Sequence, residues 1–228
     1  MTPQNSTRLK SSVLSVAAIA AVGSLGAAVQ AGLDANARQL LGGDIEFSFS
    51  QRATTPDEYA ALAAAGTVST VAEMRSMART DADRTLVELK AVDGRYPLLG
   101  EIGLHGDNDL AHALALRDGR WGAAAEASTF ARLGLKLGDA VMVGDQSYTL
   151  RAEIENEPDR SANVFTLGPR LMVALDSLPS TGLLQPGSLI RHQYRVLLPA
   201  GADTGTAIDA IKTRFPNAGW RIRSEEHT

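Results

Sequence analysis

Two histidines and two aspartates lie close together in the sequence and are of types that can bind a metal. His105 and His112 are seven residues apart, with Asp107 and Asp109 between them. Zinc sites need three or four converging ligands, and these aspartates lack the spacing of a calcium loop. We favour the alternative, a short helix capped by Asp107 or Asn108 that carries a solvated histidine. The sequence therefore predicts no metal site.

Three glutamates at alternate positions form the second group that could do chemistry. Glu153, Glu155 and Glu157 would share one face of a strand, where two carboxylates could act as acid and base. Alternate glutamates at a sheet edge are more often a solvated face, which is the interpretation we prefer. The chain also has no cysteine, no Gly-x-Ser-x-Gly elbow and no phosphate-binding loop. We predict no catalytic residue and no cofactor.

The segment 86–102 combines a strand with a turn. Residues 86–91 alternate in the period of two that places successive side chains on opposite faces of a sheet. Asp93 and Gly94 tolerate left-handed backbone angles, and Pro97 fixes its own φ. We therefore assign a structural turn without a catalytic role to Asp93, Gly94 and Pro97. If Gly94 takes a positive φ, Gly94→Ala would destabilise the fold.

Residues 13–33 form a run of 21 residues without a charged side chain. As a helix this run would be roughly 31 Å long, enough to cross the hydrocarbon core of a bilayer. Arg8 and Lys10 precede the run and Asp34 follows it, an asymmetry that places residues 1–12 in the cytoplasm. We predict a transmembrane helix at 13–33 and an extracytoplasmic domain at 34–222.

The predicted membrane helix is only modestly hydrophobic, so its small residues matter. Two rows of small residues, each spaced four apart, would let neighbouring helices approach closely. The rows are Gly23, Ala27 and Ala31, and Ser24, Ala28 and Gly32. The competing interpretation is a cleaved signal peptide, because Val29-Gln30-Ala31 fits the small-residue cleavage pattern. The continuation at 34–44, with helical spacing and a Gly-Gly stop, favours a retained helix.

The rest of the chain predicts an α/β (α+β) domain with two lobes. Thr54–Glu58 has the hydroxyl, proline and acids that begin a helix, which would end at Gly66. Both ends of the domain belong to the first lobe because both must return to the membrane, so Trp220 should lie near the strand at 44–51. The first lobe would hold strands at 44–51, 67–78, 190–198 and 220–223 with helices at 56–65 and 202–215 on one face.

The second lobe, approximately residues 86–182, is predicted to be β-rich. A hairpin with a turn at Gly144-Asp145 is expected within 133–154, because two alternating segments flank that pair. Short helices are expected at 108–117 and within 121–134. The lobe would therefore be mostly sheet, with two short helices.

Several motifs resemble a known family. The segment 88–102 reads ELKAVDGRYPLLGEI, and it is similar to a segment in the extracytoplasmic domain of FtsX-like ABC-transporter permeases, in the YbbP-like branch related to MacB. Four further stretches resemble the same family, so the likeness covers most of the chain. They read AAIAAVGSLGAA at 17–28, LLGGD at 40–44, LGLKLGD at 133–139, and EPDRSANVFTLGPRLMVALDSLPSTGLLQPGSLIRHQYRVLLP at 157–199.

The resemblance implies the function. It implies a permease fragment in the bacterial inner membrane, with a MacB-like periplasmic core domain that couples cytoplasmic ATP hydrolysis to the handling or export of a lipid-like or hydrophobic substrate. The implied partners are a separate ABC ATPase subunit and either a second permease copy or the missing C-terminal membrane helices. The alternatives are a secreted periplasmic binding or chaperone module and, third, a hydrolase, which has no nucleophile and base in its favour.

Charge and the last residues complete the expectations. The net charge of −4 gives no electrostatic reason to expect nucleic acid as a partner. Residues 223–228, Arg-Ser-Glu-Glu-His-Thr, resemble one translated frame of a common short-read sequencing adapter. We expect them to be an artefact and the chain to be a fragment; the alternative is a genuine polar tail.

Overall fold

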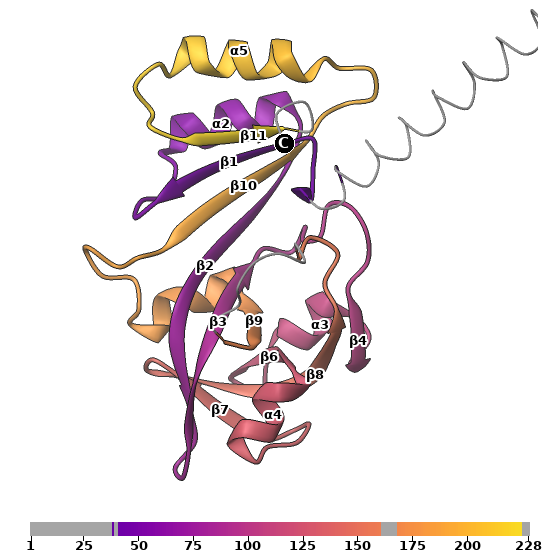
Figure 1. Cartoon of the computed structure of the whole chain (residues 1–228), viewed down its shortest axis with the longest axis vertical. Coiled ribbons are helices and arrows are strands. Elements are labelled where there is room, and N and C mark those ends of the chain that lie inside the picture. Colours follow the sequence, from indigo (N-terminus) through magenta and orange to yellow (C-terminus); the bar gives the residue numbers. More distant parts are fainter. Residues whose placement is uncertain (1–37, 39–40, 161–167, 225–228) are drawn as a thin grey trace, which may run out of the picture. The chain divides into compact units, whose positions relative to one another are not determined.

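The computed structural model describes residues 38, 41–160 and 168–224, and one mixed sheet of eleven strands runs through them. The sheet has the order β11-β1-β10-β2-β3-β9-β6-β8-β4, with β5 on β6 and β7 joining β2 to β8 (Figure 1). The strands are β1 (Ile45–Ser50), β2 (Thr67–Arg79), β3 (Arg84–Val92), β4 (Gly103–Gly106), β5 (Leu116–Arg117), β6 (Arg120–Glu126), β7 (Ala140–Val143), β8 (Gln146–Asn156), β9 (Arg170–Ala174), β10 (Arg191–Leu197) and β11 (Arg221–Ser224). The helices are α2 (Pro56–Ala65), α3 (Leu110–Leu114), α4 (Ala127–Leu133), α5 (Thr204–Arg214) and the 3₁₀ helix η1 (Leu175–Thr181).

The terminal lobe comprises β1, β10, β11, the first part of β2, and helices α2 and α5. Alternate side chains of β1 point to one face of the sheet, where Ile45, Phe47 and Phe49 pack with residues of both helices. Figure 1 shows both helices on this one side. The rings of Phe47 and Trp220 lie 5.1 Å apart. The predicted composition of this lobe, including the position of Trp220, is confirmed.

Helix α2 begins and ends where the sequence predicts. Thr55 Oγ1 accepts a hydrogen bond from the Glu58 backbone N–H at 3.2 Å, and Glu58 Oε2 accepts one from the Thr55 N–H at 2.7 Å. This reciprocal capping box, together with Pro56 at the first position, fixes the start of the helix. Gly66 follows the last helical residue and leads directly into β2.

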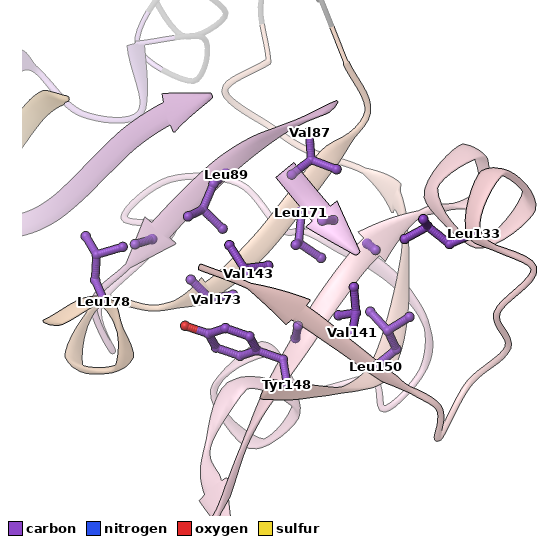
Figure 2. Close-up of a cluster of buried hydrophobic side chains, with 14 of the residues drawn as sticks. Val87, Leu89, Leu133, Val141, Val143, Tyr148, Leu150, Leu171, Val173 and Leu178 are labelled. Carbon is purple, nitrogen blue, oxygen red and sulfur yellow. The ribbon is translucent and has the colours of Figure 1, made fainter. Parts of the chain in front are cut away.

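The central lobe, residues 84–182, closes with β2 into a ring of six strands. The pairings run β2–β3–β9–β6–β8–β7 and return from β7 to β2, where Ala78 lies opposite Val143. Figure 2 shows the apolar side chains that point toward one another between these strands. Closure removes strand edges, so the small core is enclosed by hydrogen-bonded backbone. The enclosed residues include Val87, Leu89, Val141, Val143, Tyr148, Leu150, Leu171 and Val173.

Strand β2 belongs to both lobes. Its residues 67–73 pair with β10, and its residues 71–79 pair with β3. The sequence predicts two lobes and a β-rich second lobe, but it does not reveal that one continuous sheet joins them. The predicted hairpin turn at Gly144-Asp145 is confirmed, since it joins β7 to β8.

Two predicted helices differ from the structure. Residues 121–126 belong to strand β6 rather than to a helix, and only 127–133 are helical. Strand β6 pairs with both β8 and β9, so pairing within the sheet overrides the helical preference of the alanines. A Cβ at Gly122 would lie 1.8 Å from the carbonyl oxygen of Ala113 in α3, which packs closely on this strand. Helix α3 is shorter than predicted and is capped by Asp109, not by Asp107 or Asn108. Asp109 Oδ1 accepts the bond from the His112 N–H at 3.2 Å.

The turn after β3 lies where predicted, but its backbone differs. Neither Asp93 nor Gly94 has a positive φ, and the Tyr96 N–H donates to the Asp93 carbonyl at 3.3 Å around Gly94 and Arg95. A turn with negative φ at its centre accepts most residues, so the expected left-handed angle is wrong. The Tyr96–Pro97 bond is cis.

Gly94→Ala should raise the free energy of unfolding by about 0.4–1 kcal/mol. A Cβ at Gly94 would meet no atom within 4 Å, and alanine restricts the unfolded chain more than glycine. Urea unfolding of wild type and variant would measure the change.

Gly66→Ala is the matched comparison, because a Cβ there would lie 2.2 Å from the Leu197 carbonyl oxygen. That variant should lose about 1–3 kcal/mol. Equal effects of the two alanines would contradict the described backbone around both glycines.

Candidate functional site

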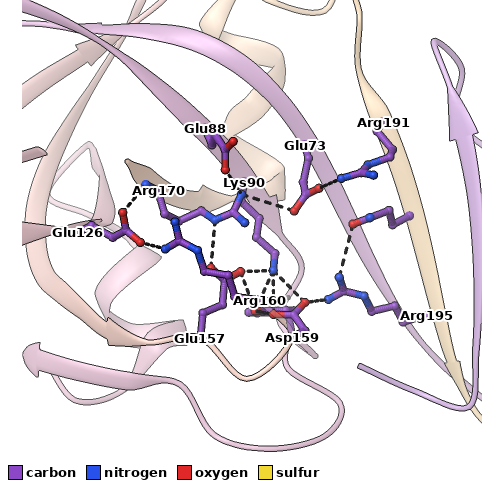
Figure 3. Close-up of polar contacts among 12 residues, drawn as sticks. Glu73, Glu88, Lys90, Glu126, Glu157, Asp159, Arg160, Arg170, Arg191 and Arg195 are labelled. Carbon is purple, nitrogen blue, oxygen red and sulfur yellow. Dashed lines mark hydrogen bonds and ion pairs between the residues drawn. The ribbon is translucent and has the colours of Figure 1, made fainter. Parts of the chain in front are cut away.

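A cluster of buried charges joins β3, β9, β10 and the chain after β8 (Figure 3). Its member Arg195 alternates along β10 with Tyr194 and Val196, which pack with α2 and α5, so Arg195 lies on the other face of the sheet. The cluster takes side chains from both lobes and from the short segment 157–160 after β8, which we call the strap. Charged groups are almost never fully buried unless they are paired, so such a cluster is the most unusual feature of the described residues. The ion cluster consists of Lys90, Glu157, Asp159, Arg170 and Arg195.

Lys90 is at the centre of the cluster, and its side chain is 1% exposed. Its position in β3 places it on the outer face of the ring, while its neighbours Leu89 and Ala91 point inside. The ammonium donates to Asp159 Oδ2 at 2.9 Å, to Tyr96 Oη at 2.9 Å and to Glu157. The Tyr96 ring also lies against this cation, with its centroid 4.3 Å from Nζ.

The strap supplies both carboxylates. Glu157 and Asp159 are two residues apart, and both turn toward the sheet. Glu157 Oε2 accepts a bond from Arg170 Nε of β9 at 3.0 Å, and Asp159 Oδ1 accepts one from Tyr96 Oη at 2.6 Å. Arg160 extends the contact to Glu126 of β6. The strap is therefore tied to β3, β6 and β9.

Arg195 brings the terminal lobe into the cluster. It lies on β10, is 4% exposed, and forms an ion pair with Asp159. Its Nε also lies 3.8 Å from Glu46 of β1. A second bridge runs through Glu73 of β2, which pairs with Arg191 of β10 at 2.7 Å and with Arg170 of β9 at 3.5 Å. The two lobes are thus joined by charge pairs in addition to β2.

Neighbouring cations lower the pKa values of Asp159 and Glu73, whereas burial and nearby carboxylates raise the pKa of Tyr96. Burial acts to raise the pKa of Asp159, but Lys90, Arg195 and the Tyr96 hydrogen bond hold it well below its usual range. Burial also acts to raise the pKa of Glu73, and the charges of Arg170, Lys90 and Arg191 lower it overall. Burial and the two strap carboxylates raise the pKa of Tyr96, so the phenol stays protonated and donates.

This arrangement holds the fold together and leaves no carboxylate of the strap free for proton transfer. Glu157 and Asp159 each face two cations, and both side chains are 1% exposed. Among the described residues there is no group of three or more histidines and acids that could hold a metal ion. We therefore interpret the cluster as a coupling element between the lobes.

The histidines and aspartates that were considered as metal ligands and rejected lie elsewhere, on and around α3. Asp107 Oδ2 is 2.6 Å from His112 Nδ1 and 3.1 Å from Arg117 Nη2. The His112 side chain is 57% exposed, as expected for a solvated histidine, and His105 lies separately on β4. The structure does not bring these residues together as a ligand set.

The prediction for the three glutamates needs a correction. Glu155 is exposed and Glu153 half-buried, but Glu157 is buried in the ion cluster rather than on a solvated face. The sheet edge at β8 is covered by β4, and the chain after β8 turns inward as the strap. Sequence reasoning also missed Lys90, Asp159, Arg170 and Arg195. The available signal was a lysine within the apolar strand Leu-Lys-Ala-Val.

The predicted structural turn supports the cluster. Asp93 Oδ1 accepts from Ser69 Oγ at 2.9 Å, and Asp93 Oδ2 accepts from the Thr70 N–H at 2.7 Å. These bonds tie the turn to β2, and the chain then returns so that Tyr96 meets Lys90. Asp93 thus holds the turn against β2, whereas a Cβ at Gly94 would meet no atom within 4 Å.

The predicted membrane segment 13–33 lies outside the described residues, with Gly23, Ser24, Ala27, Ala28, Ala31 and Gly32. Within the described ranges, no helix is long and apolar enough to cross a membrane. Arg223 and Ser224, which we expected to belong to an artefact, form the end of β11 opposite Glu46 and Ile45. Residues 225–228 are not described.

Lys90→Met should lower the free energy of unfolding by about 3–5 kcal/mol, because it leaves Glu157 and Asp159 buried with fewer cations. Urea unfolding at pH 7 would measure the loss. Lys212→Met, at an exposed position of α5, removes the same charge and should change stability little. A similar small effect of both variants would contradict a tightly coupled cluster.

Acid should weaken the domain through Asp159. Its folded-state pKa lies below the unfolded value of about 3.9, so its contribution is present above that value and is lost as pH falls toward the folded pKa. Unfolding free energies measured between about pH 5 and 2 should fall for wild type and fall less steeply for Asp159→Asn. Asp81→Asn, in the exposed β2–β3 turn, should keep the wild-type slope.

Comparison with known proteins gives the family. The sequence matches the family described as MacB-like periplasmic core domain over residues 11–214. It is 29% identical over 186 residues to an uncharacterized ABC transporter permease, YbbP of Escherichia coli (strain K12), covering 80% of this chain and 22% of that protein. The chain thus spans less than a quarter of the length of this relative.

Two solved structures share the fold. The extracellular domain of the noncanonic ABC-type transporter YknZ from Gram-positive bacteria superposes with a TM-score of 0.54 at 12% identity, covering 79% of this chain and all of that one. The periplasmic region of MacB from Actinobacillus actinomycetemcomitans gives 0.53 at 11% identity, covering 83% and 92%. The chain belongs to the family described as MacB-like periplasmic core domain.

Proposed function

We propose that this chain is the N-terminal part of a permease subunit whose extracytoplasmic domain transmits movement from the membrane. The observation that carries the proposal is the antiparallel pairing of β1 with β11, in which Phe47 lies opposite Ile222. The first and last strands of the domain are adjacent and antiparallel, so the chain enters and leaves at the same end of the terminal lobe. A domain inserted between two membrane segments needs this arrangement.

The ion cluster supports the same function. Movement applied at the terminal lobe reaches the central lobe only if the two lobes move together. Continuous β2 and the charge pairs of Arg195 with Asp159 and of Arg191 with Glu73 provide that connection. A packed, paired interface of this kind transmits displacement because it has few alternative arrangements.

The membrane part of the proposal comes from the sequence. Residues 13–33 form the membrane helix, residues 1–12 are cytoplasmic and the domain is periplasmic, in the inner membrane of a bacterium. The small-residue rows that include Ser24, Ala28 and Gly32 pack against partner helices. Those helices belong either to a second permease copy or to the C-terminal part of the subunit.

The energy source and cargo follow from the resemblance. The relative YbbP is described as an ABC transporter permease, and this sequence has no phosphate-binding loop of its own. ATP hydrolysis is therefore assigned to a separate cytoplasmic ATPase subunit. The proposed cargo is a lipid-like or hydrophobic molecule, as the family resemblance implies.

Membrane fractionation tests the anchor. The full chain should remain in the membrane pellet after carbonate washing, and protease added to the periplasmic side should reach residues beyond 34. Gly32→Leu and Ala28→Leu should impair assembly with partner helices although they raise the hydrophobicity of the segment. Co-purification of the other permease helices measures assembly.

Val22→Leu, which lies in neither row, is the matched control and should assemble normally. A cleaved signal peptide predicts the opposite pattern: a soluble protein whose N-terminus lies near Gly32 and no effect of either substitution on assembly. N-terminal sequencing of the mature chain would reveal that result and would favour the secreted binding or chaperone module.

A further inference from the structure

The hairpin formed by β2 and β3 has one face that nothing in the described residues covers. Met77 lies directly opposite Leu86 in the strand pair, and the two side chains are 41% and 37% exposed. Ala78 and Val87, which alternate with them, are buried inside the ring. The hairpin is therefore amphipathic, and its apolar pair points outward.

Arginines surround this apolar pair on the same face. Arg79 lies directly opposite Arg84 on one side of it, and Arg75 lies opposite Glu88 on the other. All three arginines are exposed. We call Arg75, Met77, Arg79, Arg84 and Leu86 the hairpin face.

The guanidinium groups of the hairpin face lack acidic partners. No hydrogen bond or ion pair is found for Arg75 or Arg84 among the described residues, and Arg79 reaches only the Gly144 carbonyl at 3.5 Å. Glu88, the one acid within these strand pairs, lies 3.8 Å from Arg170. Asp81 and Asp83 belong to the turn beyond the pairs. Arg79 and Arg84 thus place two positive charges beside the apolar pair, whereas Arg75 lies opposite Glu88.

Like charges directly opposite each other in a strand pair weaken it, so the Arg79–Arg84 pair costs the hairpin stability. An acidic partner would remove that repulsion. The apolar pair between the arginines would add burial, and arginine is among the residues enriched at protein interfaces.

The register of the sheet places the hairpin face far from the chain ends. Ile45 pairs with both Ser224 and Val196, and Val196 pairs with Val68 of β2. The end of β2 at Arg79 is eleven residues further along the strand, which at about 3.3 Å per residue is roughly 36 Å. Under the proposed function the chain ends face the membrane, so the hairpin face lies well away from lipid head groups.

We propose that the hairpin face is a docking surface for a soluble protein with an acidic, partly apolar surface on the extracytoplasmic side. The inference that the hairpin face points away from the membrane rests on the proposed function. The exposed arginines and apolar side chains of this face do not depend on it. The partner would place carboxylates opposite Arg79 and Arg84 and an apolar side chain over Met77 and Leu86.

The test uses the full chain in nanodiscs of zwitterionic lipid and two synthetic peptides of equal length, one alternating Glu with Leu and one alternating Lys with Leu. Fluorescence anisotropy should show binding of the acidic peptide only, with weaker binding at high salt. Arg84→Glu should weaken binding at least about tenfold, because it removes one favourable charge and adds a repulsive one.

Two controls separate docking from misfolding and from general charge. Arg84→Glu places opposite charges across the strand pair, so its melting temperature should not fall below that of wild type. Arg120→Glu makes the same charge change at an exposed position of β6 and should change the affinity by less than about twofold. Met77→Ser should also weaken binding, because it removes one side chain of the apolar pair.

Several results would overturn the proposal. Equal weakening by Arg84→Glu and Arg120→Glu, or no binding of the acidic peptide, would show that the hairpin face is not a docking surface. Arg84-dependent binding to phosphatidylglycerol vesicles without peptide binding would make the occupant a lipid surface. Arg84-dependent dimerisation in sedimentation would make it a second copy. Carbonate washing is independent of Arg84, so failure of this proposal and of the membrane anchor are distinguishable.

Discussion

The buried ammonium of Lys90 constrains the arrangement of both lobes. A charge inside a protein must be neutralised and hydrogen-bonded, or its burial costs several kcal/mol. The required carboxylates are on the strap, so the chain after β8 has to cross the outer face of the ring. Asp159 then meets a second cation, Arg195, which is in the terminal lobe. Neutralising one lysine therefore fixes the strap and brings the lobes together.

Stability alone does not explain why this junction is charged. A well-packed apolar interface of the same volume is often equally or more stable than buried ion pairs, whereas an unpaired buried charge is strongly destabilising. The charges instead specify one register. A slip of β3 by one residue would turn Lys90 into the apolar interior of the ring, where it has no partner. The cluster thus selects a single relation between β3, the strap and β10.

The terminal lobe was predictable because its signals are local. Alternation in β1 and the capping box at Thr55 specify their elements within a few residues. Ring closure was not predictable, since the pairing of Ala78 with Val143 joins distant segments and the alanines of β6 lack a strand pattern. The ion cluster was missed for the same reason. Its members come from four separate segments, and only the position of Lys90 within an apolar strand hinted at it.

Strand β2 runs without a break from the terminal lobe into the ring. It is the one described strand that pairs along both β10 and β3, and the ion cluster lies where these two pairings overlap, near residues 71–73. Bending there would have to separate the ion pairs of Glu73 with Arg191 and Arg170, and of Arg195 with Asp159. The Arg195–Asp159 and Arg170–Glu73 pairs are largely shielded from water, so their separation costs more than it would at the surface. Continuous β2 and these ion pairs therefore hold the terminal lobe and the ring in one arrangement.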